Sequence, residues 1–135
     1  MTITQEITLF VVTLVIFSLI DLMWVGFVAE KRYKKALKKF MTKEFKLPRI
    51  ALYYVIYVLG LLVMVLVPAV NADSLGVAVF RGAAFGFFTY AFHNLANWSS
   101  IERWPTRVTF EDIAWGSFLG FASSTLAYNF YISVF

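Results

Sequence analysis

The sequence predicts an all-α integral membrane protein, a four-helix bundle with both termini outside the cytoplasm. Three observations predict it: an apolar composition, four apolar runs of membrane-spanning length, and basic residues gathered on one side of those runs. Hydrophobic residues make up 61% of the 135 residues and charged residues only 15%. A chain this short has too little polar surface to cover so much apolar material in water, so we expect a single transmembrane domain over residues 1–135.

Each apolar run has about the 20 residues that a helix needs to cross roughly 30 Å of hydrocarbon. The first run lacks a basic leader and a small-residue cleavage site, so it is expected to stay in the protein as a helix rather than to be removed as a signal peptide. The expected spans cover residues 7–28, 50–70, 75–96 and 113–135.

The basic residues predict the direction of the spans. Residues 29–49 contain nine of the twelve Lys and Arg residues, and Arg103 and Arg107 lie in the connection between the third and fourth spans. Cytoplasmic connections carry such an excess of basic residues, so both connections are expected inside. The turn at residues 71–74 is then expected outside, together with the two termini.

The basic connection has an amphipathic helical pattern, with Tyr33, Leu37, Phe40 and Met41 on one face. We expect a helix that either continues the first span or lies among the lipid headgroups, and that stops before Pro48. It is interpreted as a topology determinant that binds anionic headgroups, or as a docking site for a partner. The basic residues expected at the membrane surface are Lys31, Arg32, Lys34, Lys35, Lys38 and Lys39.

Two glycine pairs predict how the third and fourth spans pack. Gly82 and Gly86 lie on the third span, and Gly116 and Gly120 on the fourth, each pair separated by three residues. Such spacing lets helix backbones approach closely in lipid. We expect a tight antiparallel pair of helices, and the same glycines leave a homodimer interface open as the alternative.

Polar residues form one face of the third span, because Tyr90, His93, Asn94 and Asn97 fall within an arc of roughly 100°. Lipid offers no hydrogen bonds, so this face should point into the bundle. The other spans supply polar residues at similar depth. The polar cluster or ligand site expected in the cytoplasmic half comprises Asp21, Trp24, Tyr57, Tyr90, His93, Asn94, Asn97, Asp112 and Trp115.

The two carboxylates of this cluster have separate interpretations. Asp21 lies well inside the first span and should be hydrogen-bonded or protonated, with His93, Tyr57 and Tyr90 as the expected donors. Asp112 completes a capping box with Thr109, so it is also explained as a helix cap. The pattern Asp-x-x-Trp begins at both Asp21 and Asp112, on helices that run in opposite directions, and is a hint of inverted duplication.

Several classes of function are excluded by composition. The chain has no cysteine and one histidine, so neither thiol chemistry nor a multi-histidine metal site is expected, and no cofactor is expected. The net charge of +4 reflects the basic connection rather than a surface for nucleic acid.

The chain resembles a family of small bacterial membrane proteins, domain of unknown function 2177. The resemblance covers nearly the whole chain and rests on Asp21-Leu-x-Trp24, on Tyr90-x-x-x-Asn94-Leu-x-Asn97, and most specifically on the segment from Trp104-Pro105 to Asp112-x-x-Trp115-Gly116. It implies four helices in a bacterial inner membrane and no assigned activity. The family often has aspartate at the position of Asn94 and threonine at that of Ala96, so no carboxylate role on the third span carries over.

Three functions fit these expectations. The first is a binding or transport protein that holds a small polar or amphipathic ligand in a cavity that opens to the cytoplasm. The second is a structural or regulatory subunit that docks a larger membrane complex through its glycine faces and basic helix. The third is a lipid-modifying enzyme with His93 or Asp21 as general base and Asn94 and Asn97 as oxyanion donors. The sequence leaves open the ligand, the oligomeric state and the charge state of Asp21.

Overall fold

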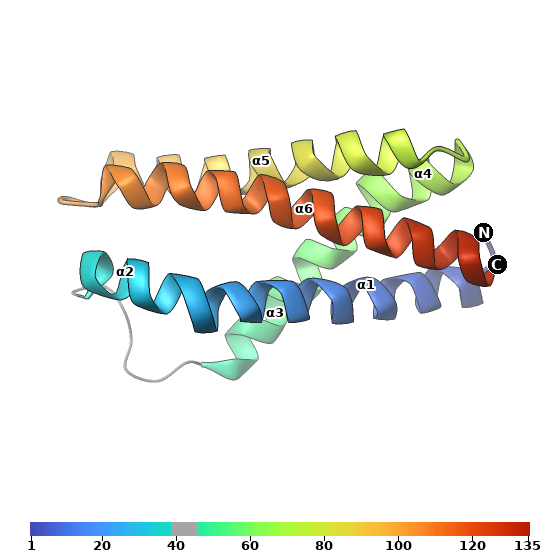
Figure 1. Cartoon of the computed structure of the whole chain (residues 1–135), viewed down its shortest axis with the longest axis horizontal. Coiled ribbons are helices and arrows are strands. Elements are labelled where there is room, and N and C mark those ends of the chain that lie inside the picture. Colours follow the sequence, from blue (N-terminus) through green and yellow to red (C-terminus); the bar gives the residue numbers. More distant parts are fainter. Residues whose placement is uncertain (39–45) are drawn as a thin grey trace.

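A computed structural model describes residues 1–38 and 46–135, which form four helical rods and no strands (Figure 1). The first rod is continuous from α1 (Ile3–Met23) through a π-helical segment, η1 (Trp24–Ala29), into α2 (Glu30–Leu37). The basic segment therefore continues the first span as far as Leu37. The predicted surface residues Lys39, Phe40 and Met41 lie outside the described residues.

A capping box starts the first rod. The Thr2 hydroxyl accepts a hydrogen bond from the backbone N–H of Gln5 at 3.3 Å, and the Gln5 side chain accepts one from the Thr2 backbone N–H at 2.8 Å. These bonds satisfy two groups that would otherwise lack partners at the helix end.

The second rod contains α3 (Leu47–Leu61), a π-helical segment η2 (Leu62–Leu66) and α4 (Val67–Asn71). Pro68 interrupts its hydrogen bonding because proline has no N–H to donate to the carbonyl four residues earlier. That carbonyl belongs to Met64, and it accepts a hydrogen bond from the Arg81 guanidinium at 3.5 Å. The bond gives Arg81 a role in the bundle near the turn between α4 and α5.

The third and fourth rods, α5 (Leu75–Ser100) and α6 (Thr106–Val134), form the closest helix pair. A Cβ atom on Gly82 would lie 2.6 Å from the carbonyl oxygen of Gly120, and one on Gly86 would lie 2.8 Å from the carbonyl carbon of Gly116. The Ser124 hydroxyl adds a hydrogen bond of 2.8 Å to the Ala78 carbonyl.

The predicted tight antiparallel pair is therefore confirmed, with the two helices side by side along their length (Figure 1). The glycine faces are occupied within one chain, since all four glycines are buried there. A homodimer would have to use another surface, because these faces are not free to meet a second copy.

Three of the four rods are long and apolar enough to cross a membrane by length and composition, namely Ile3–Leu37, Leu47–Asn71 and Leu75–Ser100. The fourth, α6, has 29 residues but falls short of the same hydropathy. Its Gly, Ser and Thr residues lower its hydropathy, and several of them face α5 rather than lipid, Ser123 and Ser124 being fully buried. Its length and its packing support a fourth span, which stays a prediction.

The two ends of the bundle differ. Both termini and the turn between α4 and α5 lie at one end, here called the terminal end, while α2, the start of α3 and residues 101–105 lie at the other, the basic end (Figure 1). Shared placement of the termini agrees with the predicted topology. Which end faces the cytoplasm stays a prediction.

The terminal half is densely packed. Its apolar cluster joins the second rod, α5 and α6 through four completely buried residues, Leu66, Ala69, Ala78 and Ala127. Leu9 adds α1 to the same cluster. Towards the basic end α3 packs on α1, where Tyr54 and Val58 contact the cluster around Phe17. The bundle is thus closed in its terminal half, and its cavity lies in the basic half.

Candidate functional site

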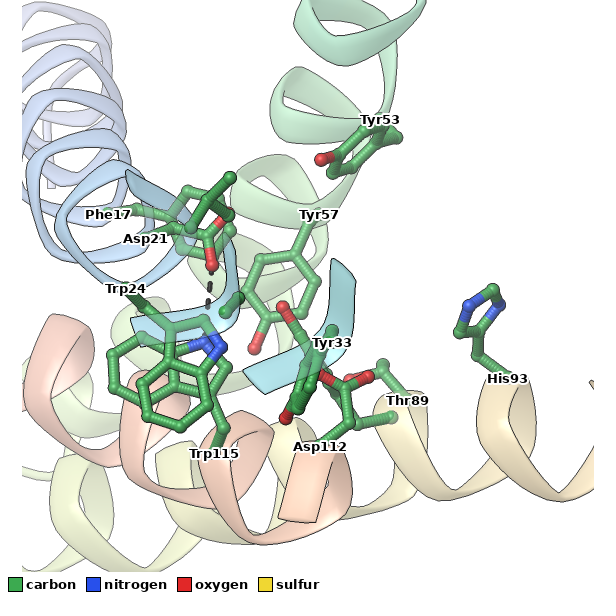
Figure 2. Close-up of a pocket in the computed structure, with 13 residues that line it drawn as sticks. Phe17, Asp21, Trp24, Tyr33, Tyr53, Tyr57, Thr89, His93, Asp112 and Trp115 are labelled. Atoms are coloured by element: carbon green, nitrogen blue, oxygen red, sulfur yellow. Dashed lines mark hydrogen bonds between the residues drawn. The ribbon is translucent and has the colours of Figure 1, made fainter. Parts of the chain in front are cut away.

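A cavity of about 600 Å³ lies among the four rods in the basic half of the bundle (Figure 2). Every rod contributes to its wall. The lining residues are Phe17, Asp21, Trp24, Val25, Ala29, Tyr33, Tyr53, Tyr57, Thr89, Tyr90, His93, Asp112 and Trp115. Seven of the nine residues predicted for the polar cluster are among them, so helical phase and depth placed most of the cluster in one space.

Asp21 is buried in α1 and is held from two other helices. Its Oδ2 atom accepts a short hydrogen bond from the Tyr54 hydroxyl of α3, and its Oδ1 atom accepts one of 3.2 Å from the Trp115 indole N–H of α6. The carboxylate therefore joins three rods at one point. The expectation that Asp21 is hydrogen-bonded is confirmed.

The predicted donors to Asp21 are wrong. His93, Tyr57 and Tyr90 all line the cavity, but none of them donates to the carboxylate among the bonds formed by the described residues. Tyr54 lies one turn before Tyr57 on the same face of α3, and its hydroxyl is the one that donates to Asp21. Trp115 reaches it because α6 runs alongside α1, whereas α5 and its His93 lie on the far side of the cavity.

The two Asp-x-x-Trp patterns meet in space. The Trp24 and Trp115 rings are stacked, with centroids 4.2 Å apart and planes inclined by only 8°. Tyr33 of α2 presents its ring to Trp24 at 6.1 Å in an edge orientation. These three rings form one aromatic wall of the cavity.

A second group of rings forms another part of the wall. Phe17 stacks on Tyr57 with centroids 4.7 Å apart, and Tyr57 meets Tyr90 edge-on at 6.3 Å. Tyr90 lies directly against Gly116, where a Cβ atom would collide with its ring. The glycine therefore positions an aromatic side chain of the cavity as well as allowing the helices to pack.

Asp112 is held by α5. Its Oδ2 atom accepts a hydrogen bond of 2.7 Å from the Asn94 amide, whose other bond of 2.9 Å goes to the Tyr90 carbonyl. Asn94 is only 1% exposed and lies beneath the cavity wall rather than in it. Since both of its N–H groups are used, it has no donor left for the oxyanion role considered in the enzyme interpretation.

The capping interpretation of Asp112 is wrong. Helix α6 begins at Thr106, with Pro105 as its N-cap residue, so Asp112 lies in the second turn. The Thr109 hydroxyl donates to the Pro105 carbonyl at 3.1 Å instead of accepting at the helix start. The carboxylate of Asp112 is therefore free to bond Asn94 and to line the cavity.

His93 and Asn97 lie farther out than the buried face predicted for them. His93 is exposed at the rim of the cavity, and its Nε2 atom lies 3.4 Å from the Asn97 amide. Asn97 does not line the cavity. A polar side chain at the rim meets water or headgroups, so its presence there needs no partner inside the bundle.

Two tyrosine hydroxyls in the cavity wall have no hydrogen bond to the described residues. The Tyr33 side chain is 8% exposed and its hydroxyl has no acceptor or donor. The Tyr57 hydroxyl is likewise buried and has no hydrogen-bond partner among the described residues. Buried hydroxyls usually have partners, so these two mark positions where a bound molecule or water would fit.

An ion-pair cluster fixes α2 against α6 beside the cavity. Glu111 accepts from Arg107 at 2.9 Å and from Arg32 at 3.3 Å. Tyr33 and Ala29 pack against Val108 just below these charges. Through this contact the basic helix keeps Tyr33 in the cavity wall.

Comparison with protein families gives one result. A family model described as predicted membrane protein, domain of unknown function 2177, matches residues 6–129. The chain belongs to this family. The resemblance read from the sequence is confirmed, and the match includes all or most of every helix and every cavity residue named above. Neither the curated proteins nor the solved structures contain a match to the chain.

Family membership assigns the chain to membrane proteins and gives no ligand or reaction. In this member of the family, Asn94 forms the amide contact with Asp112 described above. Six cavity residues are absent from the predicted cluster: the polar residues Tyr33, Tyr53 and Thr89 and the apolar residues Phe17, Val25 and Ala29. The sequence pattern identifies Tyr33 only as an apolar position of the basic helix, and the signal that could reveal its place in the cavity is the continuation of that helix from the first span.

Proposed function

We propose that this protein binds a small amphipathic molecule in the cavity between its helices. The single observation that carries the proposal is the cavity, which at about 600 Å³ falls within the range of roughly 300–1,000 Å³ typical of small-molecule sites. A purely structural cluster of polar residues would be packed closed, with no space beyond that of a water molecule.

The wall suits a molecule with an apolar part and a polar part. Stacked rings such as Trp24 and Trp115 offer flat apolar surface, and Asp21, Asp112 and Thr89 offer polar contacts on three different helices. Sites for small molecules combine these features, mostly apolar walls with a few convergent polar groups.

Binding is supported better than open passage through the membrane. The cavity occupies the basic half, whereas the cluster around Leu66 and Ala78 fills the terminal half without exposure to solvent. A ligand would enter and leave on the basic side. Transport of the same ligand would need a second conformation in which the terminal half opens, so it is an extension of the proposal.

Native mass spectrometry of the purified protein tests the proposal. The protein would be released from its host membrane in mild detergent, and a Thr89→Trp variant would fill the cavity from α5. The Thr89 hydroxyl donates to the Phe85 and Gly86 carbonyls of its own helix, so replacing it removes hydrogen bonds within α5 only. The matched control is Phe88→Trp on the lipid-facing side, where the side chain is 68% exposed.

The proposal predicts a bound small molecule on the wild type and on Phe88→Trp, and its loss from Thr89→Trp. A wild type without any adduct contradicts the proposal, and so does an adduct that persists on the Thr89→Trp variant. The measured mass of the adduct would separate a phospholipid from a smaller ligand.

A further inference from the structure

The charged groups in the cavity wall are of one sign. Asp21 and Asp112 both line it, and among the described lining residues there is no lysine or arginine. Arg32 and Arg107, on the helices beside the wall, are both paired with Glu111. Among the described lining residues, only His93 has a side chain that can become cationic, and it lies at the rim of the cavity.

Both carboxylates keep acceptor capacity. Each Asp21 oxygen accepts one hydrogen bond, from Tyr54 or from Trp115, and Asp112 accepts one from Asn94 at Oδ2. The Oδ1 atom of Asp112 accepts none from the described residues. Since a carboxylate has about four lone-pair sites, a ligand donor can bind to either group without displacing a protein bond.

The aromatic wall adds a second attraction of the same sign. The faces of aromatic rings carry negative charge density and attract cations that lie within about 6 Å of the ring centroid. Tryptophan is the strongest of these residues, and the stack of Trp24 on Trp115 lies next to Asp21 (Figure 2). Tyr33, Tyr57 and Tyr90 supply further rings around the same space.

The unpartnered Tyr33 hydroxyl points to a ligand independently of the carboxylates. Its side chain is more than nine-tenths buried, it lines the cavity, and it lies beside Asp112 (Figure 2). A phenol can donate or accept, so this group indicates a polar ligand atom without deciding its charge. The two carboxyl groups indicate the charge, because in their ionised form they attract a cation and repel an anion in a medium of low dielectric constant.

From these observations we infer that the ligand is an organic cation, an amine or a quaternary ammonium that carries an apolar group. This inference rests on the proposed function and adds to it the sign of the ligand. The cationic centre lies between Asp21 and Asp112, and the apolar group lies against the Trp24 and Trp115 stack.

Three probes of similar shape and different charge test the inference. They are tetraphenylphosphonium, which is cationic, triphenylphosphine oxide, which is neutral, and tetraphenylborate, which is anionic. Each would be measured by equilibrium dialysis against the whole protein in nanodiscs of zwitterionic lipid, with protein-free nanodiscs to subtract partition into lipid. We expect tetraphenylphosphonium to bind on the order of tenfold more tightly than the neutral probe, and tetraphenylborate to show no binding beyond the lipid background.

An Asp112→Asn variant separates the charge from the shape of the site. The asparagine oxygen still accepts from Asn94, so the variant should lose roughly tenfold in affinity for tetraphenylphosphonium and none for the neutral probe. The control is Asp73→Asn in the turn at the terminal end, where an exposed carboxylate accepts from Tyr128 at 3.4 Å. Near-ultraviolet circular dichroism of the stacked tryptophans reports whether each variant is folded.

Each outcome decides the inference. The inference of a cationic ligand is overturned if the cationic and neutral probes bind with equal affinity, or if tetraphenylborate binds most tightly. Either result leaves the proposed function standing. Binding of none of the probes also overturns the inference, while the adduct seen by mass spectrometry decides the proposed function separately. If Asp112→Asn does not fold, the ratio of the three affinities in the wild type gives the answer.

Discussion

Trp115 donates its indole N–H to Asp21 over 3.2 Å, although the two residues are 94 positions apart in the chain. The same indole ring is stacked on Trp24, one turn after Asp21. One side chain of α6 thus fixes both the carboxylate and the aromatic wall that α1 contributes to the cavity. The geometry of the site depends on this contact between the first and the last helix.

Replacing Asp21 by Ala should destabilise the bundle by about 3 kcal/mol, because the Tyr54 hydroxyl and the Trp115 N–H would both lose their acceptor. Trp115→Phe keeps a ring but removes one donor, so a loss of about 1 kcal/mol is expected. The free energy of unfolding would be measured by titration with sodium dodecyl sulfate in mixed micelles. Glu102→Ala in the exposed connection is the control, and an Asp21→Ala variant no less stable than that control would contradict the network.

Gly86→Ala should destabilise the protein by roughly 1–3 kcal/mol, since the added methyl group would overlap the Gly116 backbone. Gly26→Ala is the matched control, because nothing lies within 4 Å of the position that its Cβ atom would take. Alanine favours helix more than glycine does, so this control should be neutral or slightly stabilising. Equal thermal midpoints for the two variants would rule out the close approach of α5 and α6.

Tyr33→Phe should leave stability within about 0.5 kcal/mol of the wild type, because the hydroxyl that it removes has no protein partner. The ring contact with Trp24 is kept. The affinity for a ligand with a hydrogen-bonding head should fall by several-fold if that head reaches the hydroxyl. A marked loss of stability in the ligand-free protein would mean that Tyr33 has a structural partner instead.

The predicted topology can be tested directly because the chain contains no cysteine. Single cysteines would replace Ala72, in the exposed turn between α4 and α5, and Ser100, at the exposed end of α5. A membrane-impermeant maleimide added to spheroplasts should label the cysteine at position 72 and spare the one at position 100. Labelling in the reverse order would place the cavity in the opposite half of the membrane.

Much of this architecture could be predicted from the sequence. Hydropathy locates three of the helices, and the weaker apolar run at residues 113–135 indicates the fourth. The spacing of Gly82, Gly86, Gly116 and Gly120 predicts the close α5 and α6 pair, since only small residues permit such an approach. Helical phase then directs Asp21, Tyr90 and Asp112 towards one space. These features depend on residue spacing, which a sequence contains.

Contacts that depend on the tilt and start of a helix could not be predicted in this way. Tyr54 and Tyr57 share one face of α3, and only the angle at which α3 crosses α1 determines that Tyr54 is the donor to Asp21. Because α6 begins at Thr106, Asp112 lies in the cavity wall and not at a capping position. Pro105 is the sequence signal for this early start, since proline is favoured at helix starts.

We propose that the cavity in the basic half of the bundle, between two carboxylates and a tryptophan stack, is occupied by a ligand. An experimental structure of the protein in lipid nanodiscs, at a resolution that shows side chains, tests it most directly. The account predicts Trp24 stacked on Trp115, Asp21 bonded to Tyr54, and non-protein density between Asp21 and Asp112. A bundle in which Tyr53 and Tyr57 close onto α5, leaving no space larger than one water molecule, would contradict it.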